Sequence, residues 1–210
     1  MDSGNIGFVL LCAAFVFVMT PGLAMFYGGL VRKKNVVNTM MTSIFIIGIG
    51  IVMWVLFGYS LSFAPSGNAF IGDFSWLGLE GVSLTEGYTD DASIPNMVFS
   101  AFQMMFAVIT PALITGAVAG RMKFKSIFIF TIFWSLIVYY PLAHMVWGQG
   151  GLLGADGIGA LDFAGGDVVH ISSGVSALVL CILLGKRHDY EHSIYRIHNI
   201  PTVVLGAPLL

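Results

Sequence analysis

Three ionisable side chains lie at the mouth of a strongly apolar segment. Asp162, Asp167 and His170 occur in the stretch LDFAGGDVVHISSG, which leads directly into the apolar residues Val175–Leu184. If that segment crosses a membrane, ionisable groups there are costly, and each one indicates a function by default. A carboxylate at this place can cap the N–H groups of a turn or helix, or it can face a cationic ligand. The histidine can be functional, or it can simply bond a backbone carbonyl, and residue types alone leave these alternatives open.

A second group of candidates is aromatic. Phe99, Phe102 and Phe106 recur at spacings of three and four residues, which places them on one face of a helix. A stripe of this kind is most often core packing. Gln103 lies within the stripe, and a buried amide needs hydrogen-bond partners. The stripe is therefore interpreted as packing, and Gln103 is the member that packing explains least well.

A glycine-rich stretch precedes the ionisable cluster. Residues 148–166 read GQGGLLGADGIGALDFAGG, a composition that cannot form a stable helix. Irregular backbone at membrane depth is tolerated only where protein buries it or where it lines a wet cavity. Because Trp147 precedes the stretch and His170 follows it, we expect it to form the wall of a vestibule. His144, in PLAHMVWG, is a further candidate, but its place near a helix end favours a structural role.

The composition indicates the setting of these residues. Of the 210 residues, 57% are hydrophobic and 10% are charged, and the mean hydropathy is +0.90. Soluble domains carry about 25% charged residues, and apolar runs of about 18 residues or more indicate membrane-spanning helices. The chain is therefore predicted to be an all-α polytopic membrane protein with a single transmembrane domain, residues 1–210. The expected spans are 6–31, 36–63, 94–119, 124–147 and 168–185, with a partial sixth over 198–210. That partial span is too short to cross, so we expect the chain to be truncated in mid-span.

The charges predict the orientation in the membrane. All nine lysine and arginine residues follow the first, third and fifth spans, and so lie on one face. The positive-inside rule assigns that face to the cytoplasm and places the N-terminus outside. The opposite loop, residues 64–93, contains five acidic residues and no basic one, and such a surface can concentrate cations. Basic residues follow the first apolar segment rather than precede it, so it is interpreted as a span and not as a signal peptide.

Four strings carry a resemblance that runs through the whole chain. MTPGLAMFYGGLVRKKNV, AHMVWG, GALDFAGGDVVHISSG, and LLGKR followed by HNIP are similar, in the expected order, to signatures of the ammonium transporter family (Amt/Mep/Rh). The resemblance implies a fold of two inverted five-helix repeats, assembled as a homotrimer, with the substrate site at the repeat interface. It covers the N-terminal half only, which is the first five-helix inverted repeat and the start of helix six.

The resemblance also implies roles for individual residues. Phe102 and Phe106 match the outer aromatic positions, with Phe106 as the outer member of a stacked phenylalanine gate, and Trp147 matches the tryptophan of the external ammonium site. Asp162 matches an aspartate that supports this site. His170 is similar to the first of a pair of pore histidines and is expected to lie deeper than the helix count suggests. The second gate phenylalanine, a serine of the outer site and the second histidine are expected outside these 210 residues.

A function and a set of partners follow from the same resemblance. Ammonium would be recruited at the outer aromatic site, deprotonated, and conducted across the plasma membrane as ammonia through a hydrophobic pore that contains His170. The implied partners are ammonium or ammonia, the lipid bilayer, a homotrimer, and a PII-type regulatory protein on the cytoplasmic face near residues 186–198. The alternatives are an ammonium sensor or receptor, a gated cation channel, and a non-transporting fragment that needs the missing C-terminal half. No nucleophile–base pair, metal-ligand cluster or phosphate loop stands out, so no enzyme activity, cofactor, metal or nucleic acid is expected.

Overall fold

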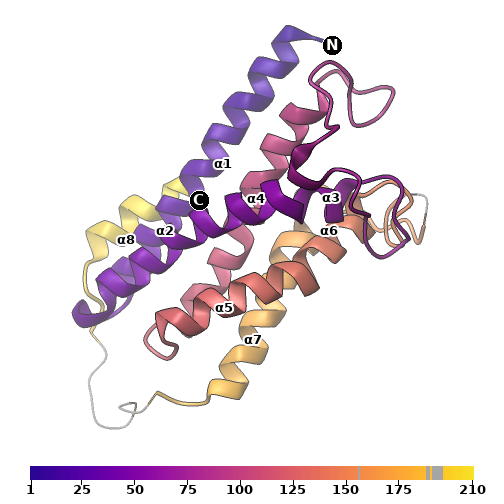
Figure 1. The fold of residues 1–210 in the computed structure, drawn as a ribbon. Coiled ribbons are helices and arrows are strands. Elements are labelled where there is room, and N and C mark those ends of the chain that lie inside the picture. The colour runs from indigo at the N-terminus through magenta and orange to yellow at the C-terminus, as the bar shows by residue number, and fades with distance from the viewer. Residues whose placement is uncertain (156, 188–189, 191–195) are drawn as a thin grey trace.

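The protein is a bundle of helices joined by turns and irregular segments (Figure 1). The computed structural model describes residues 1–155, 157–187, 190 and 196–210. Five of its helical segments are long and apolar enough to cross a membrane, and the predicted all-α polytopic fold is confirmed. The five segments are Ser3–Leu30, Lys33–Phe63, Asn96–Val118, Phe124–Trp147 and Gly166–Leu184. A shorter apolar segment, Ile200–Leu209, follows them.

Three of the spans contain a π-helical turn, in which backbone hydrogen bonds reach five residues back instead of four. The first and third spans are the continuous helices α1 (Ser3–Leu30) and α4 (Asn96–Val118). The second comprises a 3-10 turn (Lys33–Asn35), α2 (Val36–Met53), a π turn (Trp54–Gly58) and α3 (Tyr59–Phe63). The fourth comprises α5 (Phe124–Trp134), a π turn (Ser135–Tyr139) and α6 (Tyr140–Trp147). The fifth comprises a π turn (Gly166–Ile171) and α7 (Ser172–Leu184), and α8 (Ile200–Gly206) then runs into a 3-10 turn (Ala207–Leu209).

Local hydrogen bonds determine where several helices begin and end. The carboxylate of Asp2 accepts the N–H of Asn5 at the start of α1 (2.8 Å), and the side chain of Asn199 accepts the N–H of Thr202 at the start of α8 (3.1 Å). Gly185 follows α7 with a φ of 65°, a left-handed conformation that glycine adopts without strain. These boundaries are therefore encoded by single residues at the helix ends.

Two prolines lie in the interior of the long helices α1 and α4, and neither ends its helix. Pro21 is inside α1 and Pro111 is inside α4, and both helices continue past the proline. Proline removes one backbone hydrogen bond, which membrane helices tolerate where neighbouring groups satisfy the freed carbonyls. Near Pro111, the hydroxyl of Tyr27 in α1 donates to the carbonyl of Leu113 in α4 (2.9 Å). A side chain of α1 thus bonds the backbone of α4 two residues after the proline.

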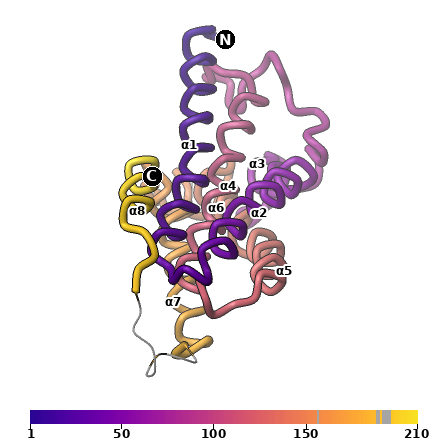
Figure 2. Tube along the Cα trace, turned by 90° about the vertical axis from the view of Figure 1, so that its left-hand side faces the viewer, coloured from indigo at the N-terminus to yellow at the C-terminus, as the bar shows by residue number. Residues whose placement is uncertain are grey.

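α4 lies at the centre of the bundle and packs against α1, α2 and α7 (Figure 2). Buried aromatic side chains join α3, the π turn before it and α6. They are Trp54, Tyr59, Phe63, Tyr139 and Tyr140. The indole of Trp54 donates to the carbonyl of Ser100 in α4 (3.2 Å). This aromatic cluster fixes the second and fourth spans to the central helix.

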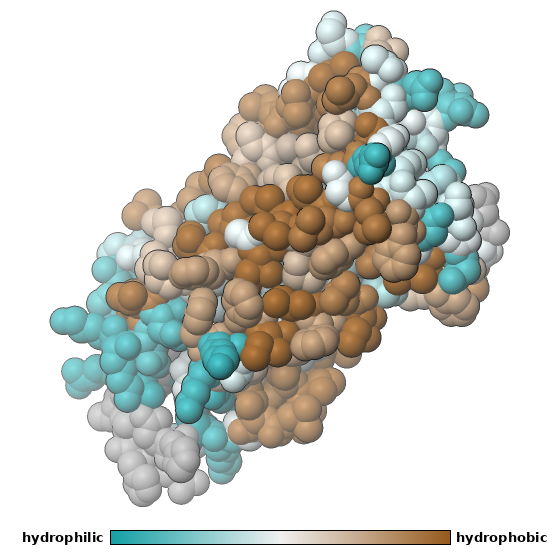
Figure 3. Space-filling model, in the orientation of Figure 1, coloured by the Kyte–Doolittle hydropathy of each residue, from teal (hydrophilic) through white to brown (hydrophobic). Residues whose placement is uncertain are grey.

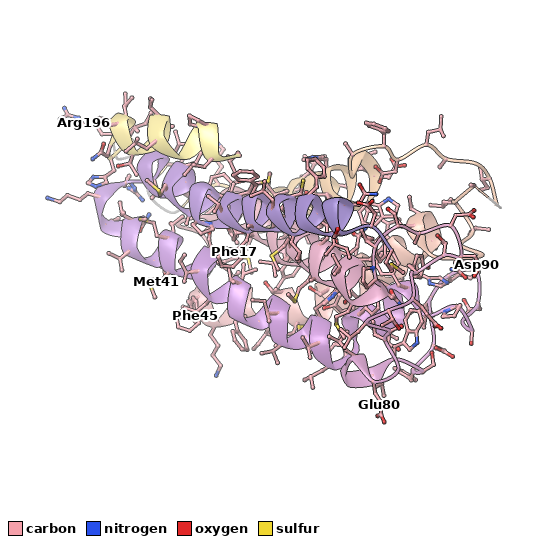
Figure 4. The ribbon with its side chains drawn as sticks, turned by 90° about the horizontal axis from the view of Figure 1, so that it is seen from above. Phe17, Met41, Phe45, Glu80, Asp90 and Arg196 are labelled. Atoms are coloured by element: carbon pink, nitrogen blue, oxygen red, sulfur yellow. The ribbon has the colours of Figure 1, made fainter. Side chains whose placement is uncertain are left out.

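The surface has an apolar middle and polar ends (Figure 3). Seen from above, Arg196 lies at one end and Glu80 and Asp90 lie at the other, with Met41 and Phe45 between them (Figure 4). Phe45 is 49% exposed and Met41 is 43% exposed. A wide exposed apolar surface of this kind marks a membrane or partner contact. The arrangement fits a multi-pass membrane protein whose basic and acidic ends lie on opposite sides.

The close contact of α1 with α8 depends on glycine. A Cβ atom on Gly206 would lie 2.5 Å from the backbone nitrogen of Phe26 and 2.6 Å from the carbonyl oxygen of Gly22. Backbone atoms cannot rotate away, so Gly206→Ala should push α8 from α1 and lower the free energy of unfolding by about 1–3 kcal/mol. Thermal unfolding in detergent measures this change. Gly48→Ala is the matched control, because no heavy atom lies within 4 Å of its Cβ position. Equal melting temperatures for the two variants would contradict the close contact of α8 with α1.

Candidate functional site

A cavity of about 660 Å³ lies between α4, the end of α6, the loop before α4 and the segment before the fifth span. Most of its lining is aromatic or apolar, and we call it the aromatic cavity. The four residues that the resemblance assigns to the outer site all line it: Phe102, Phe106, Trp147 and Asp162. His170 does not. The fold thus brings residues from three separate elements to one place.

α4 supplies one aromatic wall. Phe99, Phe102 and Phe106 all line the cavity, as their common helical face allows. The rings of Phe102 and Phe106 meet edge to face, with centroids 5.1 Å apart at an interplanar angle of 82°. Phe99 instead stacks on Tyr88, with centroids 5.0 Å apart at 6°, and packs against the aromatic core. Phe99 therefore packs against the aromatic core as well as lining the cavity, whereas Phe102 and Phe106 lie outside that core cluster.

Trp147 reaches the cavity because α6 ends at this residue. The glycine-rich stretch begins directly after it and contains no helix in its described part before Gly166. One backbone bond, from the N–H of Leu152 to the carbonyl of Ala69 (2.9 Å), holds the stretch against the loop after α3. Among the described residues of the stretch, only 162–165 line the aromatic cavity. The expected vestibule wall is thus limited to this last part.

Asp162 uses one carboxylate oxygen to hold the backbone. Its Oδ2 accepts the N–H groups of Asp167 and Val168, both at 3.1 Å, and so caps the turn Gly166–Ile171. Its Oδ1 is buried and has no hydrogen-bond partner among the described residues. A buried acceptor without a partner costs about 1–3 kcal/mol. Asp162 therefore caps the turn through Oδ2, and its Oδ1 stays buried without a partner among the described residues.

His170 lies apart from the cavity, on an open face of the fifth span. It belongs to the π-helical turn before α7, and its side chain is exposed. Val175 and Leu178 in α7 are 55% and 60% exposed. The described chain therefore does not enclose His170, and this histidine stays a predicted pore residue.

In contrast to His170, His144 is buried inside the protein. The side chain is only 1% exposed. Its Nδ1 lies 3.1 Å from the carbonyl oxygen of Ser62, and its Nε2 lies 2.8 Å from that of Asn68. These contacts join α6 to α3 and to the loop that follows α3. Burial and these two contacts indicate a structural role for His144.

A polar hollow of about 500 Å³ adjoins the aromatic cavity and shares Tyr88 and Thr89 with it. Glu86, Asp90 and Asp91 line this acidic hollow. The loop that carries them, residues 64–93, has no basic residue. Its negative potential raises the local concentration of cations. The aromatic cavity therefore lies next to a surface that attracts positive ligands.

Tyr88 is a site residue that the sequence did not reveal. It separates the acidic hollow from the aromatic cavity and stacks on Phe99. Burial raises the pKa of the Tyr88 phenol above its ordinary value, although the backbone N–H of Gln149, which donates to it, lowers it. The phenol is therefore neutral at physiological pH. A lone tyrosine in an irregular loop has no periodic pattern that could have indicated this position.

Comparison with known proteins identifies the family. The model of the Ammonium Transporter Family matches residues 7–210. The chain belongs to this family. It is 51% identical over 210 residues to an ammonium transporter of Bacillus subtilis, a match that covers 100% of this chain and 50% of that protein. The chain thus spans about half the length of the curated relatives it matches.

Two solved structures match the fold of this chain over about half of their own length. Candida albicans Mep2 matches with a TM-score of 0.87 and 32% identity, covering 100% of this chain and 46% of that one. A structure titled "Sensor Amt Protein" matches with a TM-score of 0.82 and 28% identity, covering 98% and 51%. The resemblance to the first five-helix repeat of the ammonium transporter fold is confirmed.

The cap on the fifth span gives a testable prediction. Asp162→Ala removes the acceptor of two N–H groups, so we expect a loss of about 1–3 kcal/mol in stability and faster hydrogen exchange at Asp167 and Val168. Asp162→Asn keeps an acceptor oxygen and should retain most of the protection. Hydrogen exchange with mass spectrometry in detergent measures both variants.

Asp73→Ala is the control for this experiment. The carboxylate of Asp73 also accepts two hydrogen bonds, from the N–H and the hydroxyl of Ser75, but in the loop before α4. This variant should leave exchange at residues 167 and 168 unchanged. Unchanged exchange there in Asp162→Ala would contradict the capping role.

Proposed function

We propose that the protein carries ammonium nitrogen across the plasma membrane and that the aromatic cavity recruits the cation from outside. The observation that carries the proposal is the meeting of Phe102, Phe106, Trp147 and Asp162 at one cavity, in a chain of the ammonium transporter family. Since the chain spans about half of its curated relative, the activity is proposed for the complete transporter that contains this half.

Recruitment follows from the chemistry of the two neighbouring sites. The acidic hollow concentrates cations beside the cavity. Aromatic ring faces then attract a cation by about 0.5–2 kcal/mol, depending on how far it is desolvated. In the proposal, Phe106 and Trp147 provide these rings. Ring faces attract potassium as well as ammonium, so selection requires a second property of the ligand.

That second property is the ability of ammonium to lose a proton. A bare ion in an apolar pore is unfavourable by up to tens of kcal/mol, whereas neutral ammonia is far less affected. In the proposed mechanism ammonium is deprotonated beyond the aromatic cavity and crosses as ammonia. A histidine suits proton transfer because its charge can change near neutral pH, and His170 is the proposed group. Potassium has no proton to lose and is rejected.

The proposal requires protein against the open face of the fifth span. His170 is exposed there, beside the exposed apolar residues Val175 and Leu178. In the complete transporter, an inverted second repeat would cover this face and complete the pore. The position of His170 outside the cavity supports an order of events in which recruitment precedes proton transfer.

Orientation, assembly and regulation belong to the same proposal. The separation of Arg196 from Glu80 and Asp90 (Figure 4) supports a cytoplasmic basic end and an N-terminus outside. A homotrimer, and a PII-type regulatory protein near residues 186–198, are proposed on the family resemblance. Residues 188, 189 and 191–195 of that segment lie outside the described residues.

Reconstitution into proteoliposomes tests the proposed transport. The samples are the 210-residue chain and a chimera that joins it to the remaining half of the Bacillus subtilis relative, and the readouts are current and internal pH after an ammonium jump. We expect the chimera alone to respond, because only there is His170 enclosed. His170→Ala in the chimera should lower the response at least tenfold.

His198→Ala is the matched control, since this exposed histidine lies at the basic end of the chain, outside the spans. It should leave the response unchanged. A full response from His170→Ala would refute the proton-transfer role. A full response from the 210-residue chain alone would show that no second repeat is needed.

A ring substitution tests recruitment separately. Trp147→Leu removes one aromatic face, so we expect the apparent KM for ammonium to rise about two- to thirtyfold while kcat changes little. Trp147→Phe keeps an aromatic face and should show a smaller rise. An unchanged KM in Trp147→Leu would show that Trp147 does not contribute to ammonium recruitment.

Ammonium sensing is a second candidate, favoured by the match to the structure titled "Sensor Amt Protein". A sensor would bind ammonium in the aromatic cavity without net transport. Saturable ammonium binding to the chimera, with neither current nor pH change, would favour sensing over transport.

A further inference from the structure

One residue of the glycine-rich stretch holds Tyr88 at two points. The backbone N–H of Gln149 donates to the phenol oxygen of Tyr88 (3.0 Å), and Nε2 of Gln149 donates to the backbone carbonyl of Tyr88 (2.8 Å). Gln149 comes two residues after Trp147, where α6 ends, and Tyr88 lies in the loop before α4. We call these two hydrogen bonds the Gln149 latch, because they join two irregular segments of the chain.

The Gln149 latch lies where the aromatic cavity meets the acidic hollow. Tyr88 and Thr89 line both of them. On the two sides of this boundary, Trp147 lines the aromatic cavity and Gln149 lines the acidic hollow. A cation that moves directly from the acidic hollow to the rings therefore passes Tyr88, and the position of this side chain determines how open the passage is.

The phenol ring needs directional contacts to keep its place. Residues 64–93 contain a single helical element, the 3-10 turn Leu77–Leu79, and are otherwise irregular. The ring stacks on Phe99 with centroids 5.0 Å apart and meets Phe63 edge to face with centroids 5.5 Å apart. Ring pairs form over a range of centroid distances, whereas hydrogen bonds weaken steeply when their geometry changes. The Gln149 latch therefore holds the phenol at one position along Phe99.

We propose that Gln149 is a positioning residue of the recruiting site, which keeps the Tyr88 ring against Phe99 and so keeps the passage between the acidic hollow and the aromatic cavity open. The inference rests on the proposed function, because it assigns a residue to the delivery of the cation that the cavity recruits. Without the latch, the ring leaves Phe99 for part of the time and obstructs the passage. Gln149 thus acts through the Tyr88 ring and not through contact with the cation.

Transport kinetics of the chimera in proteoliposomes test the latch. Gln149→Ala removes the donor to the Tyr88 carbonyl, so the apparent KM for ammonium should rise about two- to tenfold while kcat changes little. Gln149→Glu keeps the length of the side chain, replaces the donor with an acceptor and adds a negative charge to the acidic hollow. The added charge alone would lower the KM for a cation, so a raised KM in Gln149→Glu identifies the loss of the latch.

A double substitution separates positioning of the ring from other roles of Gln149. In the Tyr88→Leu background there is no ring to position, so adding Gln149→Ala should leave the KM of that background unchanged. A role of Gln149 in holding the loop as a whole, or in contacting the cation, would still raise it.

Asn5→Ala is the matched control. The side-chain amide of Asn5 also joins a helix to the loop before α4, by donating to the hydroxyl of Ser93 (2.9 Å). Neither Asn5 nor Ser93 lines the aromatic cavity or the acidic hollow, so this variant should leave the KM unchanged.

Three results would overturn the inference and leave the proposed function intact. They are an unchanged KM in Gln149→Ala, a KM in Gln149→Glu at or below that of the unmodified chimera, and a further rise when Gln149→Ala is added to Tyr88→Leu. If the unmodified chimera does not respond to ammonium, the proposed function and this inference fall together.

Discussion

The structure depends on one constraint, which is that backbone N–H and C=O groups in lipid must find partners within the protein. The long helices satisfy it by themselves. The glycine-rich stretch before the fifth span is not helical, and backbone bonds such as that from the N–H of Leu153 to the carbonyl of Met145 (2.8 Å) hold part of it. At the start of the fifth span, the Oδ2 of Asp162 accepts the N–H groups of Asp167 and Val168, so one carboxylate supplies acceptors where the helix begins beside the aromatic cavity. The same side chain lines the cavity, so the cap and the site share a residue.

The central helix α4 holds the aromatic wall of the cavity in place within the bundle. It packs against α1, α2 and α7, and the hydroxyl of Tyr27 bonds its backbone at Leu113. The wall formed by Phe102, Gln103 and Phe106 is carried by this helix, so its geometry follows from the packing of the whole bundle. A site on a rigid, well-packed element holds its groups more accurately than a site on a loop. The loop that borders the cavity is attached to α4 through the stacking of Tyr88 on Phe99.

Much of this architecture could be predicted because it follows from properties of single segments. Length and apolarity indicate each span, and the first, expected over 6–31, is Ser3–Leu30. The π turn Trp54–Gly58 could not be predicted, since it is as apolar as its flanks and depends on packing between spans. The resemblance indicated four residues of the cavity lining. Tyr88 was missed because its loop has no periodicity, and only the structure shows that no described residue donates a hydrogen bond to Oε1 of Gln103.

The carboxylate of Asp162 has a consequence for the proposed mechanism. A carboxylate in contact with ammonium would stabilise the charged form and oppose the loss of its proton. The Oδ2 of Asp162 accepts two backbone N–H groups, and its Oδ1 is buried, so this carboxylate serves the backbone of the wall. Aromatic rings attract a cation without carrying a formal negative charge. In the proposed mechanism, a recruiting site made of rings, with Asp162 as a support behind them, therefore opposes deprotonation less than a site with a carboxylate in contact would.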